Sequence, residues 1–194
     1  MGVSLDGLIS PDTNEAAKFS SAADIKRIRE ELDEFDVVLM GSSTLRAYGS
    51  TLTPLSGKPI TQIIYSYSGD ISLEDYQVFV KQNKFHKPIL VTNSYDLGQY
   101  NEDDWWAVFK IDSFYELKDI LTTNAKVACL GGARLLTELL SQQLVQELNI
   151  SIAPVIFGEG VPLISQKISV GLTLEKTAVN SETGEIVANY KVTY

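Results

Sequence analysis

Two short segments combine glycine with hydroxyl-bearing or basic side chains, each directly after an apolar run. Val37–Met40 leads into Gly41-Ser42-Ser43-Thr44, and Lys126–Leu130 leads into Gly131-Gly132-Ala133-Arg134. Glycine lets a ligand approach the backbone closely, and a helix that begins at such a turn offers unpaired N–H groups to phosphate. Both segments therefore have the residue types of an anion-binding turn at the carboxyl end of a strand.

The same segments also have a simpler explanation as helix caps. Serine and threonine are preferred N-cap residues, and glycine permits tight packing. Neither segment has the spacing of a Rossmann fingerprint or of a phosphate-binding loop that ends in Lys-Ser/Thr. Either segment by itself is better explained as a helix cap than as an anion-binding turn. The presence of both in one chain strengthens the anion-binding interpretation, but the helix cap stays the better explanation.

Two further segments hold the remaining candidates. Asp6 and Gly7 interrupt the apolar stretch Val3–Ile9, and an acidic residue lies between Gly158 and Gly160. Taken by themselves, these segments are a turn and a loop between strands. Asp6 is the one acid in these motifs that we nominate to polarise a substrate or to relay a proton.

Composition narrows the class of protein. The chain has 194 residues, 44% of them hydrophobic and 21% charged, as expected of a globular domain. A formal net charge of −9 disfavours a nucleic-acid partner, because phosphate backbones require a basic face, but it does not exclude a phosphorylated cofactor. No apolar run reaches the length of a membrane span and no signal pattern is present, so we expect a cytoplasmic protein. A single cysteine, Cys129, and a single histidine, His86, predict neither a disulfide nor a zinc cluster.

These residues must be positioned by an α/β framework. Helical segments alternate with β-branched runs, which predicts one domain over 1–194 with a largely parallel sheet and helices on both faces. Buried strands are expected over 37–40, 60–65, 88–92, 106–111, 126–130 and 148–153.

The helices and the C-terminus complete the expected framework. The stretches 173–179 and 186–194, separated by turn-forming residues, predict an antiparallel hairpin. Cys129, at the end of a strand, is expected to be a small buried residue rather than a nucleophile. Helices are expected over 21–35, 73–81, 113–121 and 133–144, and the first of them is expected to pack Ile25, Ile28, Leu32 and Phe35 on one face.

The order of the motifs along the chain resembles a known family. Ser4-Leu-Asp-Gly7 comes first, then Val38–Thr44, then Leu130–Leu136, and finally Leu144–Gly160. This order is similar to that in the reductase domain of the riboflavin-biosynthesis deaminase-reductase (RibD) family, a relative of dihydrofolate reductase, and the similarity covers nearly the whole chain. The resemblance implies a dihydrofolate-reductase-like mixed, mostly parallel sheet, an NADPH cofactor, a small heterocyclic substrate and a homodimer.

The resemblance also implies roles for individual residues. Thr44, with Ser42 and Ser43, would line the cofactor phosphates, and Ser66 would lie near the adenosine half. The segment Gly131-Gly132-Ala133-Arg134 would wrap the pyrophosphate, and Gly41 would belong to the cofactor side as well. Both glycine turns are therefore expected on the same rim of one sheet. Asp6 and Gly7 would border the nicotinamide. The substrate side would include Gly7, Leu52, Cys129 and Gly158.

Several positions depart from the family pattern. Leu8 stands where a basic residue is usual, Leu55 stands where an arginine meets the substrate phosphate, and Leu32 lies roughly where a second arginine is expected. Cys129 occupies a place that is commonly acidic. Arginine makes the strongest charge-assisted bonds to phosphate, so its loss favours a different, unphosphorylated substrate.

Three functions remain open from the sequence. The first is an NADPH-dependent reductase with 5-amino-6-(5-phosphoribosylamino)uracil reductase as the reference activity. The second is a reductase of a pterin, a folate-like ring or another heterocycle. The third is a non-catalytic dimeric module that binds nucleotide. The residues themselves do not decide between NADPH and NADH.

Overall fold

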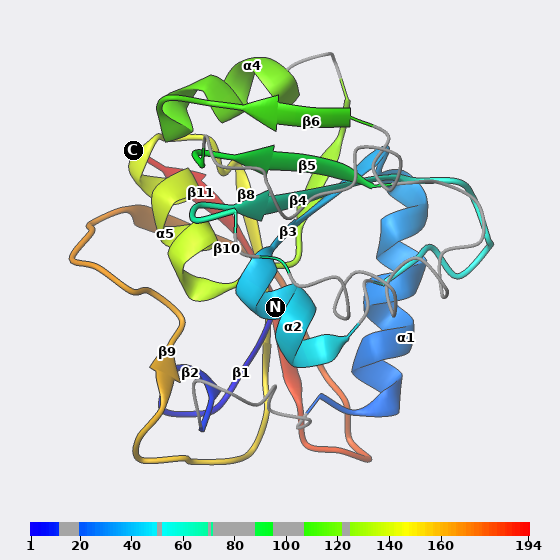
Figure 1. Ribbon diagram of the computed structural model, residues 1–194. Helices are drawn as coiled ribbons and strands as arrows, with labels where there is room; N and C mark the ends of the chain where they lie inside the picture. The colour runs from blue at the N-terminus through cyan, green and yellow to red at the C-terminus, as the bar shows by residue number, and fades with distance from the viewer. Residues whose placement is uncertain (12–19, 50–51, 70, 72–87, 95–106, 122–124) are drawn as a thin grey trace. The chain divides into compact units, whose positions relative to one another are not determined.

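The computed structural model describes residues 1–11, 20–49, 52–69, 71, 88–94, 107–121 and 125–194 (Figure 1). These residues form two compact units. The first, here called the terminal unit, is Met1–Arg27 with Gly132–Tyr194, and the second, the central unit, is Ile28–Gly131. The expected helix over 73–81 and the residue His86 lie outside the described residues. A single domain over the whole chain stays a prediction.

The central unit contains a fully parallel sheet of five strands in the order β6-β5-β4-β3-β7. Parallel strands are covered on both faces, so their sequences are continuous apolar runs rather than alternating ones. This pattern allowed each strand to be predicted within one or two residues. The strands are β3 (Val37–Gly41), β4 (Thr61–Ser66), β5 (Ile89–Thr92), β6 (Ala107–Lys110) and β7 (Val127–Cys129).

Helices flank this sheet, as expected. α2 (Ser42–Tyr48) follows β3, and the 3-10 turn η3 (Phe114–Glu116) leads into α4 (Leu117–Leu121). Ser113 and Glu116 form a reciprocal capping box that starts η3. Two clusters form the core of the unit: Met40, Leu45, Ile64, Ile71 and Leu90, and Leu32, Val38 and Ile60.

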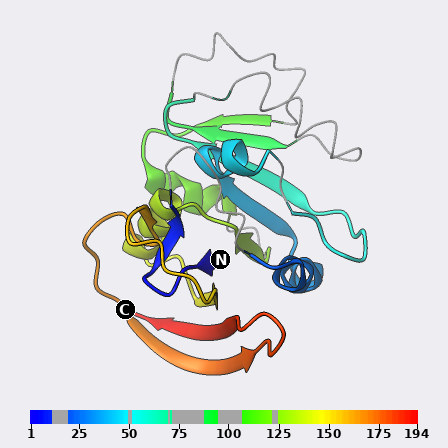
Figure 2. The same cartoon turned by 90° about the horizontal axis from the view of Figure 1, so that it is seen from below.

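The terminal unit contains a mixed sheet in the order β1-β8-β11-β10, in which only the β1–β8 pair is parallel. The predicted C-terminal hairpin is confirmed as β10 and β11 (Figure 2). α5 (Ala133–Ser141) buries Leu136 and Leu140 against Val192, and it ends three residues before the expected boundary. The strands are β1 (Gly2–Val3), β8 (Glu147–Ile152), β10 (Gly171–Val179) and β11 (Ile186–Thr193), with a separate pair β2 (Leu8–Ser10) and β9 (Val161–Pro162).

The first helix differs from its expected packing. α1 (Ala22–Glu31) continues into the 3-10 turn η1 (Leu32–Glu34), in agreement with the predicted range. Ile25, however, is 40% exposed, and Asp24 is the buried residue of α1. The prediction for Ile25 was wrong because the inward face of the helix begins with a carboxylate that has buried polar partners in the terminal unit.

Gly160 marks a close approach of two chain segments. Its φ is +152°, and a Cβ there would lie 2.0 Å from the carbonyl oxygen of Ser10. Gly160→Ala is therefore expected to lower the free energy of unfolding by about 2 kcal/mol, because the backbone must move. Urea denaturation would measure the change. Gly158→Ala is the matched control: its φ is +78° but nothing lies within 4 Å of the added Cβ, so about 1 kcal/mol is expected. Equal losses would contradict the close approach.

Candidate functional site

The two glycine turns meet at one edge of the parallel sheet. β3 and β7 are neighbours, and the N–H of Gly41 donates to the carbonyl oxygen of Gly131 at 2.8 Å. The N–H of Leu130 donates to the oxygen of Leu39 at 2.9 Å, so the pairing extends to the carboxyl ends of both strands. The expectation that both turns lie on the same rim is thus confirmed for Gly41 and Gly131.

This edge is also the topological switch point of the sheet. From β3 the chain adds β4, β5 and β6 on one side, and it then returns to place β7 on the other side of β3. In open parallel sheets, ligands bind outside the carboxyl ends of the strands where the strand order reverses. The position between Gly41 and Gly131 meets that condition.

The structure contradicts the interpretation of the turns as serine or threonine caps. The N-cap of α2 is Gly41 and the N-cap of α5 is Gly132, and no side chain caps either helix. Because glycine has no side chain, neither N-cap residue can accept from the first N–H groups of its helix. Gly131 has a φ of +96°, in the region that favours glycine, which explains its residue type independently of packing.

The residues of the two glycine turns differ in their exposure to solvent. Ser43 and Arg134 are exposed, while Ser42, Thr44 and Gly132 are partly buried. Gly41, Gly131 and Ala133 are buried. Arg134 stands in the first turn of α5, where the helix dipole disfavours a cation, so its charge is not explained by helix stability.

Ser66 ends β4 on the same edge, and its side chain is completely buried. Among the residues that the structure describes, its Oγ has no hydrogen-bond partner. Ser66→Ala is therefore expected to leave the free energy of unfolding unchanged or to raise it by up to about 1 kcal/mol, because a buried unsatisfied hydroxyl is removed. Urea denaturation beside Ser151→Ala provides the comparison, since Ser151 is an equally buried serine with a hydrogen-bonded Oγ. An equal loss in both variants would show that Ser66 has a buried partner.

Asp6 connects two candidate segments within the terminal unit. Its carboxylate accepts from Ser4 Oγ at 2.6 Å, from the N–H of Gly158 at 2.8 Å and from the N–H of Phe157 at 3.3 Å. The Ser4 hydroxyl, followed by the Gly158 N–H, lowers the pKa of Asp6. An ionised carboxylate with these donors holds the Asp6-Gly7 turn against Gly158, and it has no proton to give at neutral pH. The geometry favours a positioning role for Asp6.

Other predicted positions belong to the core. Leu52 packs against the cluster of Leu32, Val38 and Ile60, and Leu32 itself is 2% exposed. Packing therefore requires an apolar residue at Leu32, whatever the ligand. Leu55, by contrast, is 40% exposed and has no such requirement.

Cys129 is partly buried at the end of β7, and burial raises the pKa of its thiol to about 11. Alkylation by iodoacetamide at pH 8 is expected to be about 100-fold slower in the native protein than in urea, because the thiolate is scarce. The unfolded chain loses this proton first, so stability should fall as the pH rises from about 9 to about 11. Alkylation followed by mass spectrometry is unambiguous, since the chain has one cysteine. Equal rates in both states would contradict the raised pKa.

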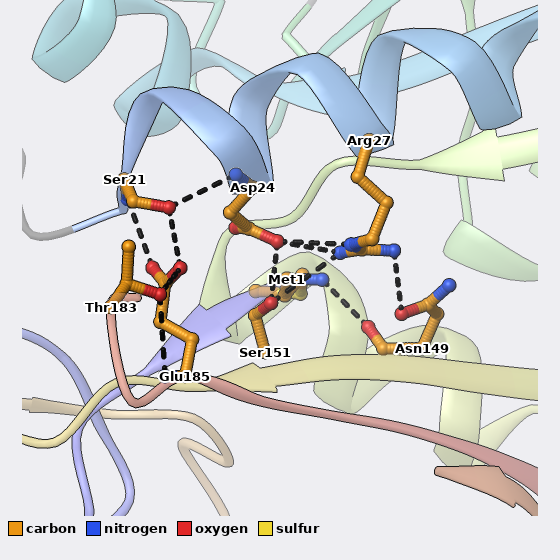
Figure 3. A network of polar contacts seen from close by, with 8 residues as sticks. All are labelled: Met1, Ser21, Asp24, Arg27, Asn149, Ser151, Thr183 and Glu185. Atoms are coloured by element: carbon orange, nitrogen blue, oxygen red, sulfur yellow. Dashed lines mark hydrogen bonds and ion pairs between the residues drawn. The ribbon is translucent and has the colours of Figure 1, made fainter. Parts of the chain in front are cut away.

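Sequence analysis missed a buried polar network in the terminal unit (Figure 3). Asp24 Oδ1 accepts from Ser151 Oγ at 2.5 Å and from Arg27 Nη2 at 2.8 Å. Arg27 Nη1 also donates to Asn149 Oδ1 at 3.3 Å. The available signal was an acid in the first helical turn with an arginine three residues later, which normally indicates an exposed ion pair.

A second buried carboxylate lies beside it. Glu185, 4% exposed, accepts from the N–H and Oγ of Ser21 and from Thr183 Oγ1. Ser21 Oγ in turn accepts from the N–H of Asp24 at 3.0 Å, so it caps α1 and links the two carboxylates. The network fastens the start of α1 to β8 and to the turn that precedes β11.

Metal-binding groups and membrane-spanning helices are both absent from the part of the chain that the structure describes. There, no group of three or more His, Cys, Asp or Glu side chains is arranged to hold a metal ion. No helix among the same residues has both the length and the apolar character to cross a bilayer.

Solved structures share this fold. The RibD of Acinetobacter baumannii matches with a TM-score of 0.80 at 15% identity, covering 100% of this chain and 57% of that one. The riboflavin biosynthesis reductase Rib7 of Saccharomyces cerevisiae matches with a TM-score of 0.72 at 20% identity, covering 99% and 87%. Dihydrofolate reductase of Enterococcus faecalis, solved with NADP(H), matches with a TM-score of 0.62 at 15% identity, covering 100% and 94%. No curated protein matches the sequence significantly.

The parallel sheet with its switch-point turns, together with the antiparallel hairpin, defines an α/β protein with a dihydrofolate-reductase-like fold. The profile of the RibD C-terminal domain matches residues 1–187. The chain belongs to the RibD C-terminal domain family. It spans 57% of the length of the Acinetobacter protein.

Proposed function

We propose that this protein is a cytoplasmic NADPH-dependent reductase of the riboflavin-biosynthesis type that acts on a small heterocyclic substrate. The observation that carries the proposal is the hydrogen bond between Gly41 and Gly131 at the switch point of the parallel sheet. Membership of the RibD C-terminal domain family supports the same activity.

The residues at this edge fit a dinucleotide cofactor. A helix begins after each of the paired strands, and each has a glycine N-cap that cannot cap it with a side chain, which suits the first N–H groups to phosphate oxygens. Ser43 and Arg134 add an exposed hydroxyl and an exposed cation. Ser42, Ser43 and Thr44 would line the cofactor phosphates at the start of α2, and the Gly131–Arg134 segment would bind the pyrophosphate at the start of α5.

The cofactor, when bound, would supply the hydride, and the protein would supply position and exclusion of water. Asp6 would act on the substrate side by holding Gly7 and the Gly158 segment in place. Its pKa is lowered, so the proton that balances the hydride would come from water rather than from this carboxyl group.

The substrate is the least constrained part of the proposal. The reference substrate, the phosphoribosylamino-uracil, needs a cation for its phosphate, and Leu55 is an exposed leucine where the family pattern has arginine. This observation favours a second candidate, an unphosphorylated heterocycle such as a pterin or a folate-like ring. Leu32 carries no weight in this choice, because the core requires an apolar residue there.

Titration of the full chain with NADPH and with NADH, followed by the fluorescence of the bound nicotinamide, tests the proposal. We expect NADPH to bind with a dissociation constant well below millimolar, and more tightly than NADH. Oxidation of NADPH in the presence of the reference substrate or of a dihydropteridine then identifies the substrate class. Binding without turnover of either compound would favour a non-catalytic nucleotide-binding module, and absence of binding would reject the enzyme.

A further inference from the structure

The carboxyl edge of the parallel sheet continues beyond the glycine turns. β4, β5 and β6 lie side by side, and the register aligns their last residues, Ser66 with Thr92 and Thr92 with Lys110 (Figure 1). The N–H of Ile111 donates to the carbonyl oxygen of Thr92 at 2.9 Å, so β5 and β6 stay paired up to this edge. The three side chains therefore form a row along the ends of the strands.

The row lies on the face of the sheet that α2 covers. Side chains two positions apart on a strand share a face. The cluster that contains Leu45 of α2 also includes Ile64, Leu90 and Val108, one from each of the strands β4, β5 and β6. Each of these three lies two positions before a member of the row. Lys110 therefore projects from the same face of the sheet as the residues that pack against α2.

Burial changes along the row. Ser66 and Thr92 are completely buried, whereas Lys110 is exposed on β6, the edge strand of this sheet. Among the described residues, none forms an ion pair with Lys110. A lysine on an edge strand also keeps other strands away, and that role needs no ligand. The two roles differ in one measurable respect, because only a ligand-binding lysine changes an affinity.

The position of Lys110 suits the adenosine end of the proposed cofactor. Under the proposed function the cofactor phosphates lie at Ser42–Thr44, and the resemblance puts Ser66 near the adenosine half. β6 lies two strand spacings, about 10 Å, beyond β4 on the side away from β3. A lysine side chain is long and flexible, so its ammonium group can extend back over β5 toward the adenosine ribose.

The chemistry of the row distinguishes two cofactors. NADPH differs from NADH by one phosphate group on the 2′ oxygen of the adenosine ribose. A phosphate monoester carries roughly −1.5 to −2 charges at pH 7, and lysine binds phosphate as a mobile point charge. Lys110 is the one cation among the described residues that end β4, β5 and β6, and the two hydroxyl side chains of the row are enclosed.

We propose that Lys110 binds the 2′-phosphate of NADPH and thereby makes the protein prefer NADPH to NADH. The proposal rests on the proposed function, because it takes the cofactor to lie along this edge of the sheet. It adds the residue that distinguishes the two cofactors.

Calorimetric titration of the full chain tests the proposal with two matched pairs of ligands, NADPH with NADH and adenosine 2′,5′-bisphosphate with 5′-AMP. Lys110→Gln is expected to weaken binding of the phosphorylated member of each pair about tenfold, the effect of one lost charged hydrogen bond, and to leave the other member unchanged. Lys110→Arg keeps the charge and should keep the preference. Lys110→Glu adds repulsion and should make NADH the tighter ligand of the first pair.

Lys126→Gln is the matched control, because Lys126 is an exposed lysine at the opposite, amino-terminal edge of the same sheet, directly before β7. It should change none of the four affinities, and circular dichroism should be the same for all variants. A natural chain without a preference for NADPH, a preference that Lys110→Gln leaves intact, or equal losses at Lys110 and Lys126 would each overturn the proposal. Binding of adenosine 2′,5′-bisphosphate that depends on Lys110, in a protein that oxidises NADPH with neither test substrate, would reject the reductase and support the phosphate contact.

Discussion

The substitution Asp24→Ala is expected to lower the free energy of unfolding by about 3 kcal/mol, the largest stability effect that we predict for a single residue. The Asp24 side chain is 1% exposed, and its Oδ1 accepts from Ser151 and Arg27. Removing the carboxylate leaves the buried Ser151 hydroxyl and a partly buried guanidinium without their main acceptor. The loss stays near the lower end of the range for buried ion pairs, because the Arg27 side chain is 23% exposed and water can reach it.

Urea denaturation of the full chain would measure this change, with Asp119→Ala as the control. Asp119 is also an acid in the first turn of a helix, but it is exposed, so its removal should cost less than about 0.5 kcal/mol. A double-mutant cycle with Ser151→Ala should show that the two losses do not add, since both remove the same hydrogen bond. Equal costs at Asp24 and Asp119, or additive losses in the cycle, would show that the network does not stabilise the terminal unit.

Arg134→Glu is expected to weaken NADPH binding about 100-fold or more. The substitution removes a charge-assisted bond to the cofactor pyrophosphate and adds repulsion, and a change of about 3 kcal/mol corresponds to that factor. The same change should leave the fold intact or stabilise it by about 0.3–1 kcal/mol. A carboxylate in the first turn of α5 complements the helix dipole, whereas arginine opposes it.

Fluorescence titration and thermal melting of the same samples would separate the two effects. Arg134→Gln removes the cation without adding an anion, so about a tenfold loss is expected. Lys167→Glu alters the net charge of the chain by the same amount at another exposed position, and it should change affinity only slightly. Equal losses at Arg134 and Lys167 would indicate a general charge effect. An unchanged affinity in Arg134→Glu would remove this residue from the proposed cofactor site.

Much of the central unit could be predicted because its signals are local. Val37–Gly41 is an uninterrupted apolar run, and Thr61–Ser66 has the apolar centre Ile63-Ile64-Tyr65, as expected of strands covered on both faces. The stop at Gly41 and the start of the next helix depend on neighbouring residues alone. The hairpin of β10 and β11 was predictable for the same reason, since its alternation and turn lie within one short stretch.

The polar interior of the terminal unit could not be predicted in this way. Asp24 is buried because Ser151 and Arg27 offer it donors, and Ser151 lies 127 residues away in the sequence. Leu32 had the appearance of a lost phosphate contact, yet the structure shows that it fills the core beside Val38. Whether a side chain faces a ligand, the solvent or the core depends on which distant segments pack against it.

The sequence by itself determined the order of the strands and helices, the glycines of both turns and the membership of a family. Tertiary structure alone decided that Gly41 and Gly131 are joined by a hydrogen bond, that a carboxylate belongs to the interior, and that Lys110 ends a row of aligned strand ends. The physical reason is that backbone conformation follows from neighbours along the chain. Burial and hydrogen-bond partners, by contrast, follow from neighbours in space.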